Sequence, residues 1–315
     1  MQTKTDPAQC AKPEKQSGAV LLQCLIVMIL WGSLFPAVKI GYGAFGMDTG
    51  YVPNLILFAG IRFTICGGIL MLSCAARRIP LALPKHTWLP VAGAACTAIV
   101  LHYACSYTGL AMTDSGKTSI LKQICSVIFV CIAAFRRMHG TERLKQLIGV
   151  CLGFAGIVII NFEGGIRLGT GEILILCASV CSVTSSVISK GVVAKMPPLA
   201  FTAVTQFGGG LVLLAAGLLA GGNIGQLTVR SGGVFAYVCF ASVISYSLWY
   251  GVMRKADLSR LFIIKMLEPM FAALFGAFLL GEDIWNWRFP VAFVCIAAAV
   301  IISREKKETD ALSGK

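Results

Sequence analysis

Ten apolar runs, each close to 20 residues long, dominate this sequence of 315 residues. A helix of that length spans the roughly 30 Å of hydrocarbon in a bilayer, whereas the strands of a membrane barrel alternate apolar and polar residues. Helices also satisfy their own backbone polar groups, as lipid requires. The sequence therefore predicts an all-α integral membrane protein with ten transmembrane helices, over residues 19–40, 53–73, 88–112, 117–135, 145–161, 172–193, 199–220, 233–252, 260–280 and 287–303.

The composition agrees with this class. Hydrophobic residues make up 57% of the chain and charged residues 13%, which excludes a water-soluble surface. The links between the runs are too short to hold a soluble domain. Residues 1–17 are polar and are expected to form a disordered N-terminal tail, and residues 304–315 form a C-terminal tail.

The chain also contains an internal duplication, because residues 91–135 match residues 234–278 without a gap. The shared residues include two tyrosine pairs and a lysine pair, which are Tyr103 with Tyr246, Tyr107 with Tyr250, and Lys122 with Lys265. We expect one five-helix repeat over residues 18–161 and a second over 171–303. Since five crossings invert the second copy, a pseudo-twofold axis should lie in the membrane plane, with the substrate site beside it.

Positive charge is distributed unevenly between the links. Of the 27 lysines and arginines, 19 lie in links or near run ends on the side of the N-terminus and four lie on the other side. The remaining four, Lys39, Arg62, Lys122 and Lys265, lie deeper in the apolar runs. The positive-inside rule then places both termini in the cytoplasm, and we expect a plasma or inner membrane. The net charge of +13 is spread through many links on one face, so anionic lipid explains it better than nucleic acid does.

Several short motifs occur in order along almost the whole chain, from about residue 19 to 303. They are Trp31-Gly32-Ser33-Leu34-Phe35-Pro36, Arg62-Phe63, Tyr107-Thr108-Gly109-Leu110-Ala111, Leu267-Glu268-Pro269 and Gly281-Glu282. In these motifs the chain resembles EamA-type members of the drug/metabolite transporter superfamily. The resemblance implies secondary-active transport of small molecules by alternating access. The first repeat departs from the pattern, since Cys125-Ser126 stand where the second has Glu268-Pro269.

Arg62 is the sharpest candidate for a binding residue. A charge at the bilayer centre costs about 2.5 to 3.5 kcal/mol on insertion scales, so Arg62 is not expected to face lipid. Its planar fork suits a carboxylate or a phosphate of the substrate. The alternative is a structural ion pair, for example with Glu268, that joins the second and ninth spans.

Lys122 and Lys265 occupy equivalent positions of the two repeats. They are candidates for binding an anionic substrate, and the resemblance to the plastid phosphate translocators of the same superfamily implies such a role for basic residues in these spans. The alternative is that each lysine reaches the nearer membrane interface. Glu268 is expected either to neutralise Lys265 or to carry a coupling proton, and Pro269 to hinge the ninth span.

The other candidates for the pathway are aromatic side chains and one histidine. Seven aromatic residues are expected to line the substrate site, or alternatively to pack helices and anchor them at the interface: Trp31, Phe35, Tyr103, Tyr107, Tyr246, Trp249 and Tyr250. His102 is the one histidine within a span. It is a candidate carrier of a coupling proton, or a neutral ring that hydrogen-bonds another helix.

Other classes of function find less support. Thirteen cysteines without a CxxC motif and three scattered histidines predict neither a metal site nor a cofactor. The spans lack clustered carboxylates and histidines, so we expect a transporter rather than an intramembrane enzyme or a lipid-flippase subunit.

The substrate class follows from charge. Four basic residues in the spans against Glu268 favour a small polar substrate that carries a carboxylate or a phosphate, with a hydrophobic-cation efflux carrier as the alternative. Export or exchange is expected, coupled to a proton or a counter-substrate, by a monomer or a homodimer.

Overall fold

Every regular element in the described part of the chain is a helix. The computed structural model describes residues 18–113, 115–161, 169–281 and 287–303. The helices are α1 (Gly18–Phe45), α2 (Val52–Ala76), α3 (Trp88–Ala95), the π-helical η1 (Cys96–Leu101), α4 (His102–Met112), α5 (Ser115–Arg137), α6 (Gly140–Asn161), α7 (Thr170–Val193), α8 (Pro198–Leu219), α9 (Val229–Lys255), α10 (Leu258–Lys265), α11 (Glu268–Leu280) and α12 (Arg288–Ile302).

Helix is present at each of the ten predicted positions. The third span is built from α3, η1 and α4 in succession, and the ninth from α10 and α11. In the described residues, seven helical stretches are long and apolar enough to cross a membrane, and α12 is apolar but shorter. The prediction of an all-α, multi-pass membrane fold is therefore confirmed. Both tails and Glu282 lie outside the described residues.

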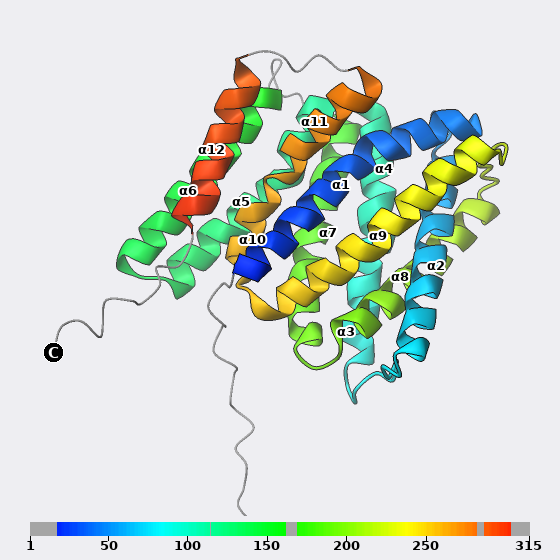
Figure 1. The fold of residues 1–315 in the computed structure, drawn as a ribbon, viewed down its shortest axis with the longest axis horizontal. Helices are drawn as coiled ribbons and strands as arrows, with labels where there is room; N and C mark the ends of the chain where they lie inside the picture. Colours follow the sequence, from blue (N-terminus) through cyan, green and yellow to red (C-terminus); the bar gives the residue numbers. More distant parts are fainter. Residues whose placement is uncertain (1–17, 114, 162–168, 282–286, 304–315) are drawn as a thin grey trace, which may run out of the picture.

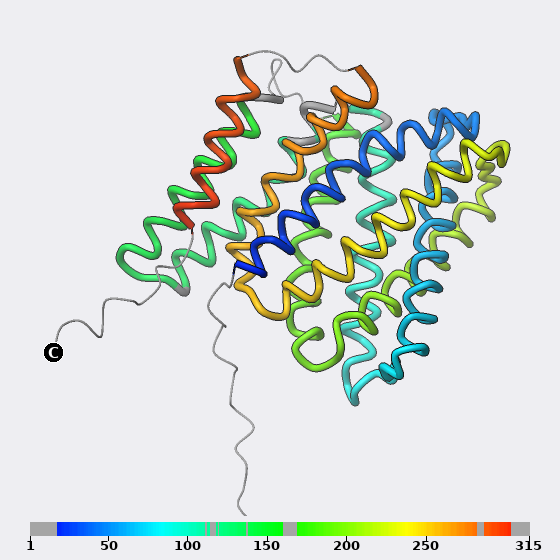
Figure 2. The backbone as a smooth tube through the Cα atoms, in the orientation of Figure 1, coloured from blue at the N-terminus to red at the C-terminus, as the bar shows by residue number. Residues whose placement is uncertain are grey.

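The two halves of the chain interleave. Figure 2 shows α1 between α9 and α11 of the second half, and α7 of the second half packs against α4 and α5 of the first. In addition, α2 packs along α8, and α6 packs along α12 in a pair at one end of the molecule (Figure 1). Exchanging each helix for its counterpart in the other half reproduces this set of contacts, as the predicted twofold relation requires.

Glycine allows a close approach between the halves at the contact of α2 with α8. A Cβ atom at Gly67 would overlap the backbone of Phe207, and one at Gly210 would overlap the backbone of Thr64. Small residues at such positions let helix backbones approach closely in a membrane, where dispersion forces drive association. This contact places Arg62 of α2 in the interior.

A break in the ninth span distinguishes the two repeats. The helix α10 ends at Lys265 and α11 begins at Glu268, with Pro269 in the first turn of α11. Proline lacks the N–H that would bond to the carbonyl of Lys265, so a continuous helix is disfavoured here. The equivalent span of the first repeat, α5, is continuous. The irregular element of the first repeat is instead the π-helical turn η1 in the third span.

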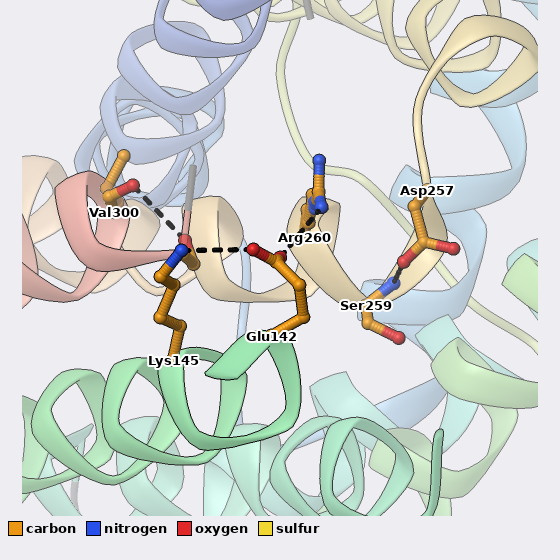
Figure 3. A network of polar contacts seen from close by, with 7 residues as sticks. Glu142, Lys145, Asp257, Ser259, Arg260 and Val300 are labelled. Carbon is orange, nitrogen blue, oxygen red and sulfur yellow. Dashed lines mark hydrogen bonds and ion pairs between the residues drawn. The ribbon is translucent and has the colours of Figure 1, made fainter. Parts of the chain in front are cut away.

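Charged residues join α6 to the start of α10 (Figure 3). Glu142 of α6 lies 3.0 Å from the ammonium of Lys145 and 3.7 Å from the guanidinium of Arg260 on α10. Asp257 caps α10 by accepting a 2.9 Å hydrogen bond from the backbone N–H of Ser259. These residues lie on the side predicted to be cytoplasmic. Because Glu142 is partly exposed, these ion pairs contribute at most about 1 kcal/mol each.

The Gly67→Ala substitution tests the contact of α2 with α8. We expect it to lower the thermal unfolding temperature in detergent, because the added methyl group forces α2 away from Phe207. The matched control is Gly68→Ala on the same helix, where a Cβ meets nothing within 4 Å. Since alanine favours a helix over glycine, the control should be neutral or slightly stabilising. Equal melting temperatures for the two variants would contradict this packing.

Candidate functional site

Arg62 is held by two hydroxyl groups deep in the bundle, with 2% of its surface exposed. Its Nε and Nη2 groups donate hydrogen bonds of 3.0 and 2.8 Å to the hydroxyl of Ser242 on α9. Its Nη1 group donates a 3.3 Å bond to the hydroxyl of Tyr107 on α4. The Ser242 hydroxyl donates to the carbonyl of Val238, which orients its lone pairs toward the guanidinium. Arg62 therefore connects helices of both halves.

Within the described ranges, the charge of Arg62 has no acidic partner. Among the described residues both salt bridges involve Glu142, and the ion pair of Arg62 with Glu268 that the sequence allowed is not formed. The guanidinium instead lies over the rings of Phe63 and Tyr103, at 4.9 and 5.9 Å from their centroids. Such cation–π contacts offset only part of the cost of a buried charge. The site thus retains a positive charge.

Aromatic side chains form a continuous wall next to Arg62. The hydroxyl groups of Tyr103 and Tyr246 hydrogen-bond to each other. These tyrosines occupy equivalent positions of the two predicted repeats, so their contact is where a pseudo-twofold axis would be expected to pass. Tyr246 packs on Trp31 with ring centroids 5.5 Å apart, and Trp31 packs on Trp249 at 5.0 Å. The sequence predicted these four residues near one another.

Lys122, Lys265 and Glu268 gather at the other end of this wall. Lys265 donates a 3.1 Å hydrogen bond to the hydroxyl of Ser182 on α7, and its ammonium lies 5.7 Å from the ring centroid of Trp31. The ammonium of Lys122 lies 4.8 Å from the centroid of Phe35. Neither lysine makes a salt bridge with Glu268, although both interact with it electrostatically.

The helix break explains why Lys265 and Glu268 do not pair directly. In a continuous helix, residues three apart lie on one face, but here α10 ends at the first residue and α11 begins at the second. Glu268 is buried, and its Oε2 atom has no hydrogen-bond partner. This carboxylate therefore remains available to a ligand or a proton.

His102 forms the contact expected of a structural residue. Its Nδ1 atom lies 2.9 Å from the backbone carbonyl of Ala178 on α7. A carbonyl oxygen can only accept, so Nδ1 carries a proton. The ring also packs edge-on against Tyr103 at 5.1 Å. A role in proton coupling stays a prediction.

Three predicted residues lie at the margin of the site or outside it. Phe35 is 40% exposed, so only its contact with Lys122 joins it to the site. Tyr250 is buried, packs on Phe201 with centroids 4.8 Å apart, and reaches the wall only at its edge, 6.4 Å from the ring of Tyr246. Lys39, which the sequence counted among the basic residues of the spans, is exposed on α1.

A separate groove of about 470 Å³ lies between α1, α9 and α11. Its lining is mostly apolar, from residues such as Ala37, Val234 and Phe275, and includes Ser33 hydrogen-bonded to Tyr237 at 2.6 Å. None of the predicted site residues lines this groove. In the described part of the chain, no group of three or more histidine, cysteine or acidic residues is placed to hold a metal.

Sequence reasoning missed Ser242 and Ser182, the two hydroxyl groups that hold Arg62 and Lys265. A serine within an apolar span is common and carries no charge, so by itself it gives little signal. The spacing gave a signal for Ser242, since Ser242 precedes Tyr246 by four residues and shares its helix face.

The Ser242→Ala substitution tests how Arg62 is held. It removes the acceptor of two hydrogen bonds from a buried guanidinium, and we expect a loss of about 1 to 3 kcal/mol of stability. Ser247→Ala is the control, since that hydroxyl bonds only to the carbonyl of Val243 on its own helix. Thermal unfolding in detergent measures both. A loss no larger than that of the control would show that Ser242 does not hold Arg62.

Comparison with known proteins places this site in context. The sequence matches the model of the EamA-like transporter family twice, over residues 17–162 and 169–304. An uncharacterized transporter of Archaeoglobus fulgidus is 26% identical, over 88% of this chain and 93% of the relative. A Salmonella typhimurium protein named "Probable amino-acid metabolite efflux pump" is 22% identical, over 88% of this chain and 92% of the relative.

A solved crystal structure has the same fold. It matches with a TM-score of 0.73 over 92% of this chain and 99% of that one, at 17% sequence identity. At that identity the likeness concerns the fold alone. The family match is independent of it and extends over both halves, so this protein belongs to the EamA-like transporter family.

Proposed function

We propose that this protein is a secondary-active carrier that exports or exchanges a small polar metabolite bearing a carboxylate or a phosphate. The observation that carries the proposal is the uncompensated positive charge of the site. In the part of the chain that the structure describes, Arg62 is buried without an acidic partner, and Lys122 and Lys265 share the carboxylate of Glu268. Anions bind where preorganised cations have no other counter-ion.

The fold supports alternating access as the mechanism. The helices that hold the site come from both halves, and their contacts are related by an approximate twofold exchange. Two arrangements of one half against the other then open the site to either side of the membrane in turn. Glu268 and Pro269, at the break between α10 and α11, are the residues where we propose that binding is coupled to movement. A proton or a counter-substrate completes the cycle, in a monomer or a homodimer.

A hydrophobic cation is the alternative substrate class, because aromatic rings also bind cations. In this site, however, the rings already hold cations of the chain itself. Lys265 lies over Trp31, Lys122 lies over Phe35, and Arg62 lies over Phe63 and Tyr103. A positively charged substrate would be repelled by these groups. The name of the Salmonella relative accords with export of a small metabolite.

Ligand-induced stabilisation of the purified protein tests the substrate class. We expect carboxylates and phosphate esters to raise the unfolding temperature, and quaternary amines of similar size to leave it unchanged. A ligand at 100 times its Kd stabilises by about 2.7 kcal/mol. The Lys122→Gln and Lys265→Gln variants should lose the effect, whereas Lys195→Gln, at an exposed site outside the bundle interior, should keep it. Stabilisation by amines alone would overturn the proposal.

We also propose that the protein resides in a plasma or inner membrane with both termini in the cytoplasm, on the strength of the bias of 19 basic residues against four. Reporter fusions at the C-terminus test this orientation. Green fluorescent protein should be bright there, and alkaline phosphatase, which is active only outside the cytoplasm, should be inactive. A dark fluorescent protein together with active phosphatase would show that the C-terminus lies outside the cytoplasm.

A further inference from the structure

The positive charge of the site is divided between two separate positions. The first, the arginine pole, is Arg62 with Tyr107 and Ser242 and belongs to α2, α4 and α9. The second, the lysine pole, is Lys122 with Lys265 and belongs to α5 and α10. No hydrogen bond or salt bridge joins residues of one pole to residues of the other in the described part of the chain.

With every side chain in its ordinary ionisation state, each pole has a net positive charge. The arginine pole contains one guanidinium and no carboxylate. The lysine pole contains two ammonium groups within the electrostatic reach of one carboxylate, Glu268. A single positive charge is thus left at each pole. Because burying an unpaired charge is costly, each pole favours an anionic partner of its own.

Aromatic surface connects the two poles. From Arg62 the contacts run over the ring of Tyr103, through the hydroxyl pair to Tyr246, and on to Trp31, which lies beneath the ammonium of Lys265. Along this path Trp31 has a buried indole N–H without a hydrogen-bond partner. The surface between the poles therefore offers flat apolar area together with donors, which suits an unsaturated or aromatic body.

We infer that the substrate carries two anionic groups at opposite ends of a flat, largely apolar body; this inference rests on the proposed function as an anion carrier. One end, a carboxylate, binds the second N–H groups of Nη1 and Nη2 of Arg62, beside those that donate to Tyr107 and Ser242. The other end, a carboxylate or a phosphate, binds between Lys122 and Lys265. The body lies against Trp31 and Tyr246. Two anionic ends balance the single positive charge at each pole.

Isothermal titration of the purified full chain with four carboxylates tests this inference. They are benzene-1,4-dicarboxylate, biphenyl-4,4′-dicarboxylate, benzene-1,2-dicarboxylate and benzoate. The first two place their charges at opposite ends, the third carries equal charge on adjacent carbons, and the fourth carries one charge. We expect at least one of the two end-to-end dicarboxylates to bind ten-fold or more tightly than both benzoate and the 1,2 isomer, a difference of about 1.4 kcal/mol. Its stoichiometry should be one per chain.

Substitutions at each pole test which anionic end of the ligand binds there. Lys265→Gln and Arg62→Gln should each reduce the affinity of the end-to-end dicarboxylate to that of benzoate, while Lys195→Gln should leave it unchanged. If Arg62→Gln does not fold, Lys122→Gln and Lys265→Gln still test the lysine pole. Tyr107→Phe, which removes only the hydroxyl next to Arg62, then tests the arginine pole.

The outcomes separate this inference from the proposed function. If all four anions bind with similar affinity, the inference of a two-ended substrate is wrong, but the proposal of an anion carrier is unaffected. The same holds if two benzoate molecules bind per chain, each as tightly as one end-to-end dicarboxylate. If the 1,2 isomer binds as tightly as the end-to-end isomers, total charge matters and the separation of the poles does not. If no carboxylate or phosphate ester binds and quaternary amines do, both proposals fail.

Discussion

A charged side chain inside a membrane protein has few stable locations, and this constraint determines how many of the helices of this structure pack. Lipid solvates neither backbone polar groups nor ions, so the chain forms helices and turns its charged side chains toward other helices. Arg62 illustrates the result. Close packing of α2 on α8 places it in the interior, and hydroxyl groups from two other helices accept its hydrogen bonds. These neutral partners hold the guanidinium without cancelling its charge.

The fold was largely predictable from the sequence because its signals are local. A run of about 20 apolar residues identifies a membrane helix, and a gapless repeat of tyrosine and lysine pairs identifies the internal duplication. Pro269 likewise indicated where the ninth span would break. The π-helical turn at Cys96–Leu101 was not predicted, since no residue in that segment lacks an N–H or disfavours a regular helix strongly.

The grouping of the candidate residues was more predictable than their contacts. Arg62, Tyr103, Tyr246 and Trp31 lie along one aromatic wall, and Lys122 and Lys265 both interact with Glu268 at one end of it. Their partners depend on which helix faces meet, and hydropathy does not contain that information. The contact of Arg62 with Ser242 is an example, because it joins residues 180 positions apart through a side chain that any apolar helix can carry.

The hydroxyl pair of Tyr103 and Tyr246 has a geometric consequence for motion. An operation that exchanges the two halves maps each of these residues onto the other, so the contact is its own image. In the proposed alternating-access cycle, an exchange of conformations between the two halves would leave this contact in place, while each off-axis contact would be replaced by its twofold equivalent. The pair would then be a fixed point about which α1 and α7 exchange environments.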